Sequence, residues 1–197
     1  MINSDELNQC QLNNSDGSFT GCVATPSFDY PQSWQNVLSV TFTTVNNTPY
    51  AYVVAVTGFF ASKVFQCRVN DQTGDLIGST CQAITDNNVG IPVSMTLATV
   101  NGNQYAYLNS IFSGLWKCGV DSENGQFNAC TLLSDTRPYQ LAFKTINNTQ
   151  YAYVAGQDGV NQCDLNTDGS FGSCALTPAE NSVWSGAINS VVFNPGD

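Results

Sequence analysis

The segment from Cys163 to Cys174 reads CDLNTDGSFGSC. An Asp-Gly pair lies near its middle, residues of alternating polarity flank that pair, and a cysteine stands at each end. Glycine after aspartate supplies the positive φ that a tight β-hairpin needs. We therefore predict two short antiparallel strands, joined by a turn and linked through their cysteines.

Three further segments repeat this arrangement, and together the four copies contain all eight cysteines of the chain. Eight cysteines allow 105 pairings, but the repeat favours pairing within each copy. Zinc is the alternative, although no copy has the short cysteine spacing of a zinc knuckle. The predicted disulfides are Cys10–Cys22, Cys67–Cys81, Cys118–Cys130 and Cys163–Cys174, and they indicate an oxidising compartment.

A second repeat consists of tyrosine, alanine and tyrosine, preceded by a polar turn and, further back, by an apolar anchor in an alternating stretch. The period of two predicts strands. The tyrosines on either side of the alanine fall on one face, so we expect them to pack against a neighbouring sheet rather than form a ligand-binding ladder. The copies are Tyr50-Ala51-Tyr52, Tyr105-Ala106-Tyr107 and Tyr151-Ala152-Tyr153, with anchors Phe42, Leu97 and Phe143.

The two repeats combine into units of four strands that recur about every 50 residues, which is the period of a propeller blade. We predict an all-β fold, a four-bladed β-propeller of four-stranded antiparallel blades with one disulfide per blade. Residues 1–197 are then a single domain, with blades at 36–84, 91–133, 138–177 and at 1–24 together with 186–197.

Four cysteine hairpins accompany only three tyrosine strands. The spacing would place a fourth tyrosine strand near position 201, beyond Asp197. We therefore expect one blade to be split between the two ends of the sequence and to lack its second strand. Either the ring closes with a gap, or another chain fills the gap, or the sequence is part of a longer array. Such a gap leaves backbone donors and acceptors unpaired, which favours strand addition by a neighbour.

Composition argues against several functions. The chain has 15 acidic and 5 basic residues and a net charge of −10, which disfavours nucleic acids and anionic lipids. Histidine is absent, and with it the Ser-His and Cys-His nucleophile pairs. No apolar run is long enough for a membrane helix. The first residues do not resemble a secretory leader, so we expect export to be encoded upstream or the mature chain to be given.

Asp164, Asn166 and Asp168 match the start of a calcium-binding loop. An EF-hand-like loop would need an acid where Ala175 stands, and the related hairpins lack the first acid. The hairpin interpretation is therefore preferred, and we expect no metal and no cofactor.

Aromatic side chains form the candidate binding site. In a propeller they would fall on loops at one mouth of the ring, where they could stack on sugars or pack on a protein. The alternative is that they cover the ends of the core. These residues are Tyr30, Trp34, Phe59, Phe60, Phe112, Tyr139 and Trp184.

Other motifs are weaker. Asp86, Asp135, Arg137 and Glu180 fall in the same class of loop, and paired acids are the minimum for a glycosidase; because no acid recurs at a fixed position, we assign no catalytic residue. Acceptor patterns for N-glycosylation begin at Asn13, Asn46 and Asn147, all in predicted turns.

The runs Tyr-Ala-Tyr-Val, Gln-Cys-x-Val/Leu-Asn and Asp-Gly-Ser-Phe-x-x-Cys resemble the secreted bacterial YVTN or lactonase-like β-propeller repeats, in a cysteine-paired variety. The resemblance covers nearly the whole chain and implies an extracytoplasmic binding or structural module. Larger members have about seven blades. The polar and metal-binding residues of the lactonase and lyase relatives have no counterpart in this sequence.

We therefore expect a secreted or cell-surface, non-enzymatic module that binds or self-assembles, for example into a filament. Its expected partners are copies of itself, an extracellular protein or a glycan. A lectin-like module is the first alternative, and a lactonase- or lyase-like hydrolytic enzyme is the second.

Overall fold

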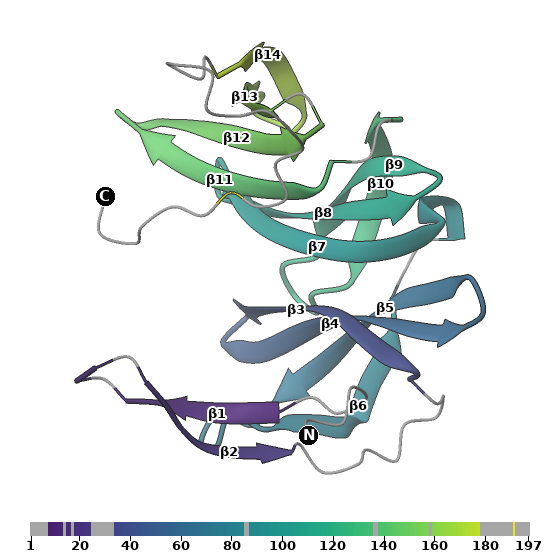
Figure 1. Ribbon diagram of the computed structural model, residues 1–197, viewed down its shortest axis with the longest axis vertical. Helices are drawn as coiled ribbons and strands as arrows, with labels where there is room; N and C mark the ends of the chain where they lie inside the picture. Colours follow the sequence, from purple (N-terminus) through teal and green to yellow (C-terminus); the bar gives the residue numbers. More distant parts are fainter. Residues whose placement is uncertain are drawn as a thin grey trace. The chain divides into compact units, whose positions relative to one another are not determined.

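The computed structural model describes residues 8–13, 15–16, 18–24, 34–84, 87–135, 138–157, 159–177 and 191. These residues form an all-β fold, as predicted, with 14 strands in four antiparallel sheets (Figure 1). Among them the short 3-10 turn η1 (Asn87–Val89) is the one helical element. The chain divides into two compact units, Met1–Thr85 with Glu123–Gly125 and Asp86–Ser122 with Gln126–Asp197.

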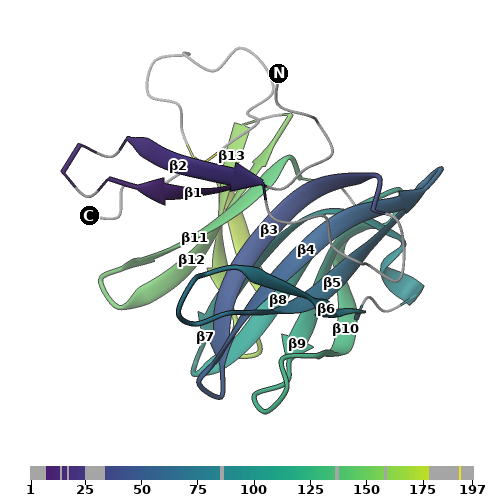
Figure 2. The same cartoon turned by 90° about the horizontal axis from the view of Figure 1, so that it is seen from below.

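The first unit contains a two-stranded and a four-stranded sheet, each with its strands in chain order. The two-stranded sheet pairs β1 (Asn8–Leu12) with β2 (Phe19–Ala24). Figure 2 shows the twist of the four-stranded sheet. Its strands are β3 (Asn36–Val45), β4 (Thr48–Gly58), β5 (Ala61–Val69) and β6 (Leu76–Ala83).

The second unit contains two sheets of four strands, again in chain order. The first of them comprises β7 (Ile91–Val100), β8 (Asn103–Ile111), β9 (Gly114–Val120) and β10 (Phe127–Ser134). The second comprises β11 (Gln140–Ile146), β12 (Thr149–Gly156), β13 (Gly159–Leu165) and β14 (Phe171–Leu176). The predicted blade ranges 36–84, 91–133 and 138–177 thus each contain one four-stranded sheet.

The first hairpin of each four-stranded sheet closes through a two-residue turn. Both residues of each turn have a positive φ, as in a type I′ turn, which matches the right-handed twist of the paired strands. Asparagine and glycine tolerate this conformation better than other residues, which explains the polar pairs seen in the sequence. The pairs are Asn46-Asn47, Asn101-Gly102 and Asn147-Asn148.

Each four-stranded sheet carries the same row of residues across its first three strands: the apolar anchor, the alanine of the tyrosine motif and the first cysteine. Phe143 pairs with Ala152, and Ala152 pairs with Cys163. All three alanines are fully buried, and the first cysteines are buried with them. The small alanine side chain thus leaves room in the row for side chains that pack over it. The other two rows are Phe42–Ala51–Cys67 and Leu97–Ala106–Cys118.

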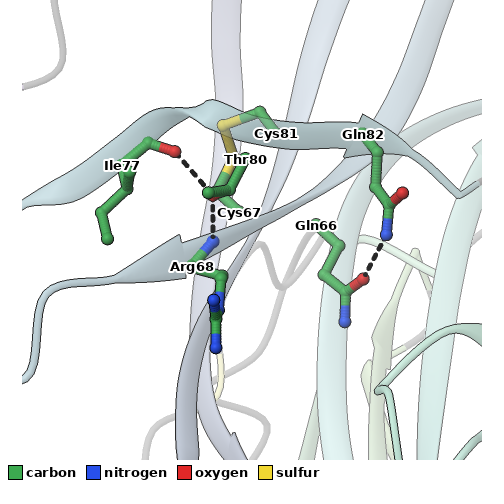
Figure 3. Close-up of a disulfide and its surroundings, with 7 residues drawn as sticks. All are labelled: Gln66, Cys67, Arg68, Ile77, Thr80, Cys81 and Gln82. Carbon is green, nitrogen blue, oxygen red and sulfur yellow. Dashed lines mark hydrogen bonds between the residues drawn. A yellow bond between two sulfur atoms is a disulfide. The ribbon is translucent and has the colours of Figure 1, made fainter.

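All four predicted disulfides are present, and no described cysteine is free. Each joins two cysteines on neighbouring strands, and the Cα atoms of the two cysteines are 4.0 or 4.1 Å apart. Figure 3 shows Cys67–Cys81, where Thr80 accepts the Arg68 amide at 2.8 Å and donates to the Ile77 carbonyl at 2.6 Å. The bonds make the zinc alternative wrong and agree with an oxidising environment.

The strand predicted within 186–197 lies outside the described residues, apart from Val191. The Val191 amide donates to the Gln140 side-chain oxygen at 2.7 Å. The arrangement of the sheets as a four-bladed ring, with one blade split, remains a prediction.

Candidate functional site

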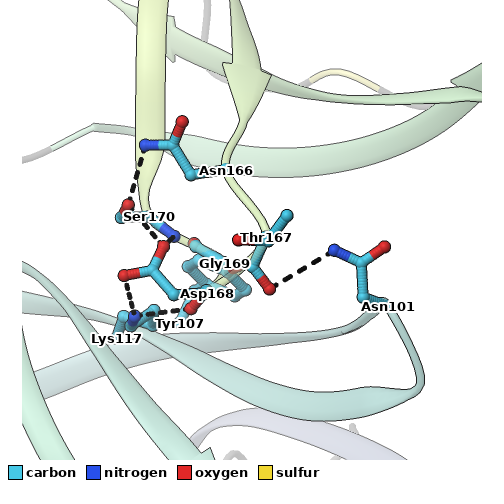
Figure 4. A network of polar contacts seen from close by, with 8 residues as sticks. All are labelled: Asn101, Tyr107, Lys117, Asn166, Thr167, Asp168, Gly169 and Ser170. Atoms are coloured by element: carbon cyan, nitrogen blue, oxygen red, sulfur yellow. Dashed lines mark hydrogen bonds and ion pairs between the residues drawn. The ribbon is translucent and has the colours of Figure 1, made fainter.

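Tyr107 on β8 makes a buried polar contact in the second unit. Its hydroxyl donates to the carbonyl oxygen of Gly169, in the turn between β13 and β14, at 2.7 Å (Figure 4). The ring packs against Phe143 and Phe171, with centroid separations of 4.7 and 6.0 Å. Tyr107 therefore joins one sheet to the cysteine hairpin of the next, as expected for tyrosines that pack between sheets.

A second donor stands beside this tyrosine. The ammonium group of Lys117, the residue before Cys118, donates to the carbonyl of Asp168 at 2.7 Å and lies 3.7 Å from its carboxylate (Figure 4). It also lies 5.1 Å from the centroid of the Tyr105 ring. The turn is thus bound at two successive carbonyls.

The receiving turn is shaped to admit the tyrosine. Gly169 has a φ of +76°, and a Cβ atom there would lie 2.9 Å from Cδ2 of Tyr105 and 3.0 Å from the Tyr107 hydroxyl. One carboxylate oxygen of Asp168 accepts hydrogen bonds from the amide and hydroxyl of Ser170, at 2.9 and 2.6 Å. These bonds lower the pKa of Asp168. Both hydrogen bonds lie within the turn and stabilise it independently of the contacts from Tyr107 and Lys117.

The first unit contains the same pair of contacts. The turn Glu123–Gly125, which lies between β9 and β10, belongs to this unit. The Tyr52 hydroxyl donates to the Gly125 carbonyl in this turn at 2.6 Å. The side-chain amide of Gln66 donates to the Asn124 carbonyl at 2.6 Å. We call this pair, a tyrosine hydroxyl on the turn glycine and a long donor on the preceding carbonyl, the tyrosine contact.

Burial keeps the donating phenols neutral. Desolvation raises the pKa of Tyr52 to about 12, against a hydrogen bond with Gln66 that acts in the opposite direction. Desolvation likewise raises the pKa of Tyr107 and of Tyr153. A neutral phenol is the form that can donate to a carbonyl.

The turn between β5 and β6 contains a glycine with nearly the same φ as Gly125 and Gly169. Gly74 has a φ of +77°, and its amide donates to the Asn70 carbonyl at 2.8 Å. Gly125 and Gly169 are buried beneath their tyrosines, whereas Gly74 is exposed.

The predicted aromatic residues divide into two kinds. Trp34 is half-buried and packs against the core cluster of the first unit, with its ring 5.0 Å from that of Phe65. This is the packing of a side chain that covers the core. Trp116, which is not one of the predicted binding residues, is also half-buried and donates its indole N–H to the Ser113 carbonyl at 2.8 Å.

The other residues of the predicted aromatic set that the structure describes are exposed and lie at turns. In the first unit, Phe59 and Phe60 end the β4–β5 hairpin, with their rings edge to face at 4.4 Å. In the second unit, Phe112 ends the β8–β9 hairpin and is 85% exposed, while Tyr139 precedes β11 and is more covered. Tyr30 and Trp184 lie outside the described residues. Phe59, Phe60 and Phe112 are thus the most exposed of the predicted residues that the structure describes.

Two of the three calcium-loop residues bond within the turn itself, since Asn166 donates to the Ser170 hydroxyl at 2.9 Å and Asp168 accepts from the same serine. In the described part of the chain no three acidic, cysteine or histidine side chains gather as a metal site would require. Of the predicted acidic group, Asp135 is exposed, and Asp86, Arg137 and Glu180 fall outside the described residues. The glycosylation candidates Asn46 and Asn147 are exposed at turns.

A cleft of about 550 Å³ in the second unit lies over the Cys163–Cys174 disulfide and is also lined by Leu115, Asn161 and Phe171. Its lining contains no acidic or basic side chain, so it offers no acid–base pair. No helix in the described ranges is long and apolar enough to span a membrane.

Sequence reasoning missed the donor that precedes each first cysteine. The signal was present: Gln9, Gln66, Lys117 and Gln162 are all long side chains with an N–H donor. For Gln66 and Lys117 the role became visible only in the structure, where each donates to the turn carbonyl that precedes the turn glycine.

Neither the known protein families nor the curated proteins contain a match to this chain, and its resemblance to the YVTN or lactonase-like propeller repeats therefore rests on the motifs alone.

Proposed function

We propose that the chain is a non-enzymatic, extracellular module that binds a partner or assembles with copies of itself. In this proposal its four disulfide-bonded sheets are the blades of a four-bladed propeller, and one blade is completed from outside. The four disulfides support a location outside the reducing cytoplasm.

The tyrosine contact is the observation that carries the proposal. Tyr52 and Tyr107 each bind the turn glycine of the cysteine hairpin that comes next along the chain. A contact that links repeat to repeat within a chain can also link a repeat to a partner, because it needs only a phenol and a turn carbonyl. Gly74 has nearly the same φ as the two bound glycines but is exposed.

Size-exclusion chromatography with light scattering, followed by electron microscopy, tests the self-assembling form of this proposal. We expect species larger than a 21.1 kDa monomer, with a population that grows with protein concentration. A strictly monomeric sample at every concentration would remove self-assembly and leave only binding to a different partner.

A lectin-like module is the second candidate, and one observation favours it. Phe60 and Phe112 present exposed rings from backbone with φ of +54° and +69°. A positive φ is unfavourable for a bulky residue, and such strain is frequently retained for a function. Exposed rings of this kind can stack on sugar faces. A glycan array tests the idea: binding that survives both Phe60→Ala and Phe112→Ala, or no binding at all, would reject it.

A further inference from the structure

The four-stranded sheet in the first unit has a glycine turn that resembles the accepting half of a tyrosine contact, without a tyrosine bound to it. Gly74, Gly125 and Gly169 share nearly the same φ, at +77°, +72° and +76°. Gly125 and Gly169 are buried, and each carbonyl accepts a phenol. Gly74 is exposed, and within the described residues no side chain donates to its carbonyl.

An aromatic side chain in the same sheet is independently exposed. In the second unit, Phe143 lies under the Tyr107 ring and is half-buried. Phe42 holds the equivalent place, since each phenylalanine pairs with the alanine of its own tyrosine motif. Phe42 is nevertheless 62% exposed. Both the ring platform and the acceptor carbonyl of this contact are therefore uncovered.

The sequence contains no further motif to fill the position. Its three tyrosine motifs lie on β4, β8 and β12. Tyr52 and Tyr107 are already bound to Gly125 and Gly169, and Tyr153 is buried. The tyrosine that fits here therefore comes from outside these three motifs, and we consider one that a different polypeptide supplies.

We propose that Phe42 and Gly74 form a docking site for an extended segment of another polypeptide that carries tyrosine, a small residue and tyrosine. The second tyrosine stacks its ring on Phe42 and donates its hydroxyl to the Gly74 carbonyl. The inference rests on the proposed function, because it names the chemistry of the partner. A phenol is uncharged at neutral pH, so the net charge of −10 does not oppose its approach.

The chain provides its own probe. A labelled synthetic peptide with the sequence QYAYVAG, that of residues 150–156, is titrated against the whole protein and followed by fluorescence anisotropy. We expect saturable binding at one site per chain. Replacing the second tyrosine of the peptide by phenylalanine should weaken binding about tenfold, which is what one buried hydrogen bond contributes.

Matched protein variants locate the site. Phe42→Ser should weaken peptide binding at least tenfold, while Leu132→Ser, which removes an exposed apolar side chain in the other unit, should leave it unchanged. Both positions are exposed, so both variants should fold, and circular dichroism checks that they do. Absence of saturable binding, equal effects of the two variants, or indifference to the hydroxyl would each overturn the proposal.

The result of the peptide-binding experiment can be distinguished from the result on the oligomeric state. Peptide binding by a monomeric protein would support the docking site while rejecting self-assembly. Assembly without peptide binding would retain self-assembly and reject this site. If the peptide dissolves the assemblies, the same site serves both.

Discussion

The hydroxyl of Tyr107 lies 2.7 Å from the carbonyl oxygen of Gly169, and both residues are buried. Removing the hydroxyl in Tyr107→Phe leaves that carbonyl without its phenol donor while the ring still packs. We expect the free energy of unfolding, measured by urea denaturation, to fall by about 1–3 kcal/mol, the cost of an unsatisfied buried polar group.

Tyr105→Phe is the matched control, because Tyr105 precedes the same alanine but does not donate to Gly169. It should change stability by about 0.5 kcal/mol or less. Equal losses in the two variants would show that the hydrogen bond to the turn is not what joins the two sheets.

The close approach of Gly169 to the tyrosine rings can be separated from its φ. Gly169→Ala places a Cβ 2.9 Å from the Tyr105 ring at a φ of +76°, whereas Gly102→Ala meets nothing within 4 Å at a φ of +80°. Gly102→Ala should cost about 1 kcal/mol from backbone strain alone. Gly169→Ala should cost about 1–3 kcal/mol more, measured by thermal or urea unfolding. Equal costs would mean that the turn is not tightly enclosed.

The raised pKa of Tyr52 predicts loss of stability in alkali. The folded protein holds this phenolic proton to a pKa of about 12, against an ordinary value of 10.0. The folded state therefore binds more protons than the unfolded state between these values, so its stability is fully present below pH 10 and falls as the pH rises toward 12. Urea unfolding at several pH values measures the slope. Tyr52→Phe should reduce the slope, and an unchanged slope would contradict the assignment to Tyr52.

The disulfide between Cys163 and Cys174 closes a short loop. Its removal in the double variant Cys163→Ala and Cys174→Ala should lower the free energy of unfolding by about 3 kcal/mol, through the entropy that the unfolded chain regains. The measurement is urea denaturation without reductant. Wild-type protein in reductant, which loses all four bonds, should lose considerably more.

The sequence was most informative where local chemistry decides the structure. Asn-Asn or Asn-Gly pairs specify the first turn of each four-stranded sheet because asparagine and glycine tolerate a positive φ, and alternation around Phe143 specifies the strand that contains it. The four disulfides followed from the same local repeat. Exposure at Phe42 and Gly74 could not be predicted, because it depends on which side chains the fold brings over each sheet, and their sequence context matches that of their buried counterparts. Trp34 illustrates the same limit. A tryptophan before a strand can line a binding site or cover the core, and the contact of Trp34 with Phe65 in the structure is what distinguishes the two.

The strained phenylalanine at the tip of β8–β9 gives a test of whether its ring is retained for binding. Phe112 is 85% exposed with a φ of +69°, so it contributes little to the core and its backbone is unfavourable for a bulky residue. Phe112→Asn should leave the protein as stable or raise the unfolding free energy by up to about 1 kcal/mol, because asparagine tolerates this conformation. Phe59→Asn is the control, since Phe59 is as exposed but is not among the positive-φ residues, and it should bring no such gain. A marked loss of stability in Phe112→Asn would instead show that the ring packs on the folded protein, and the lectin-like proposal would lose its main support.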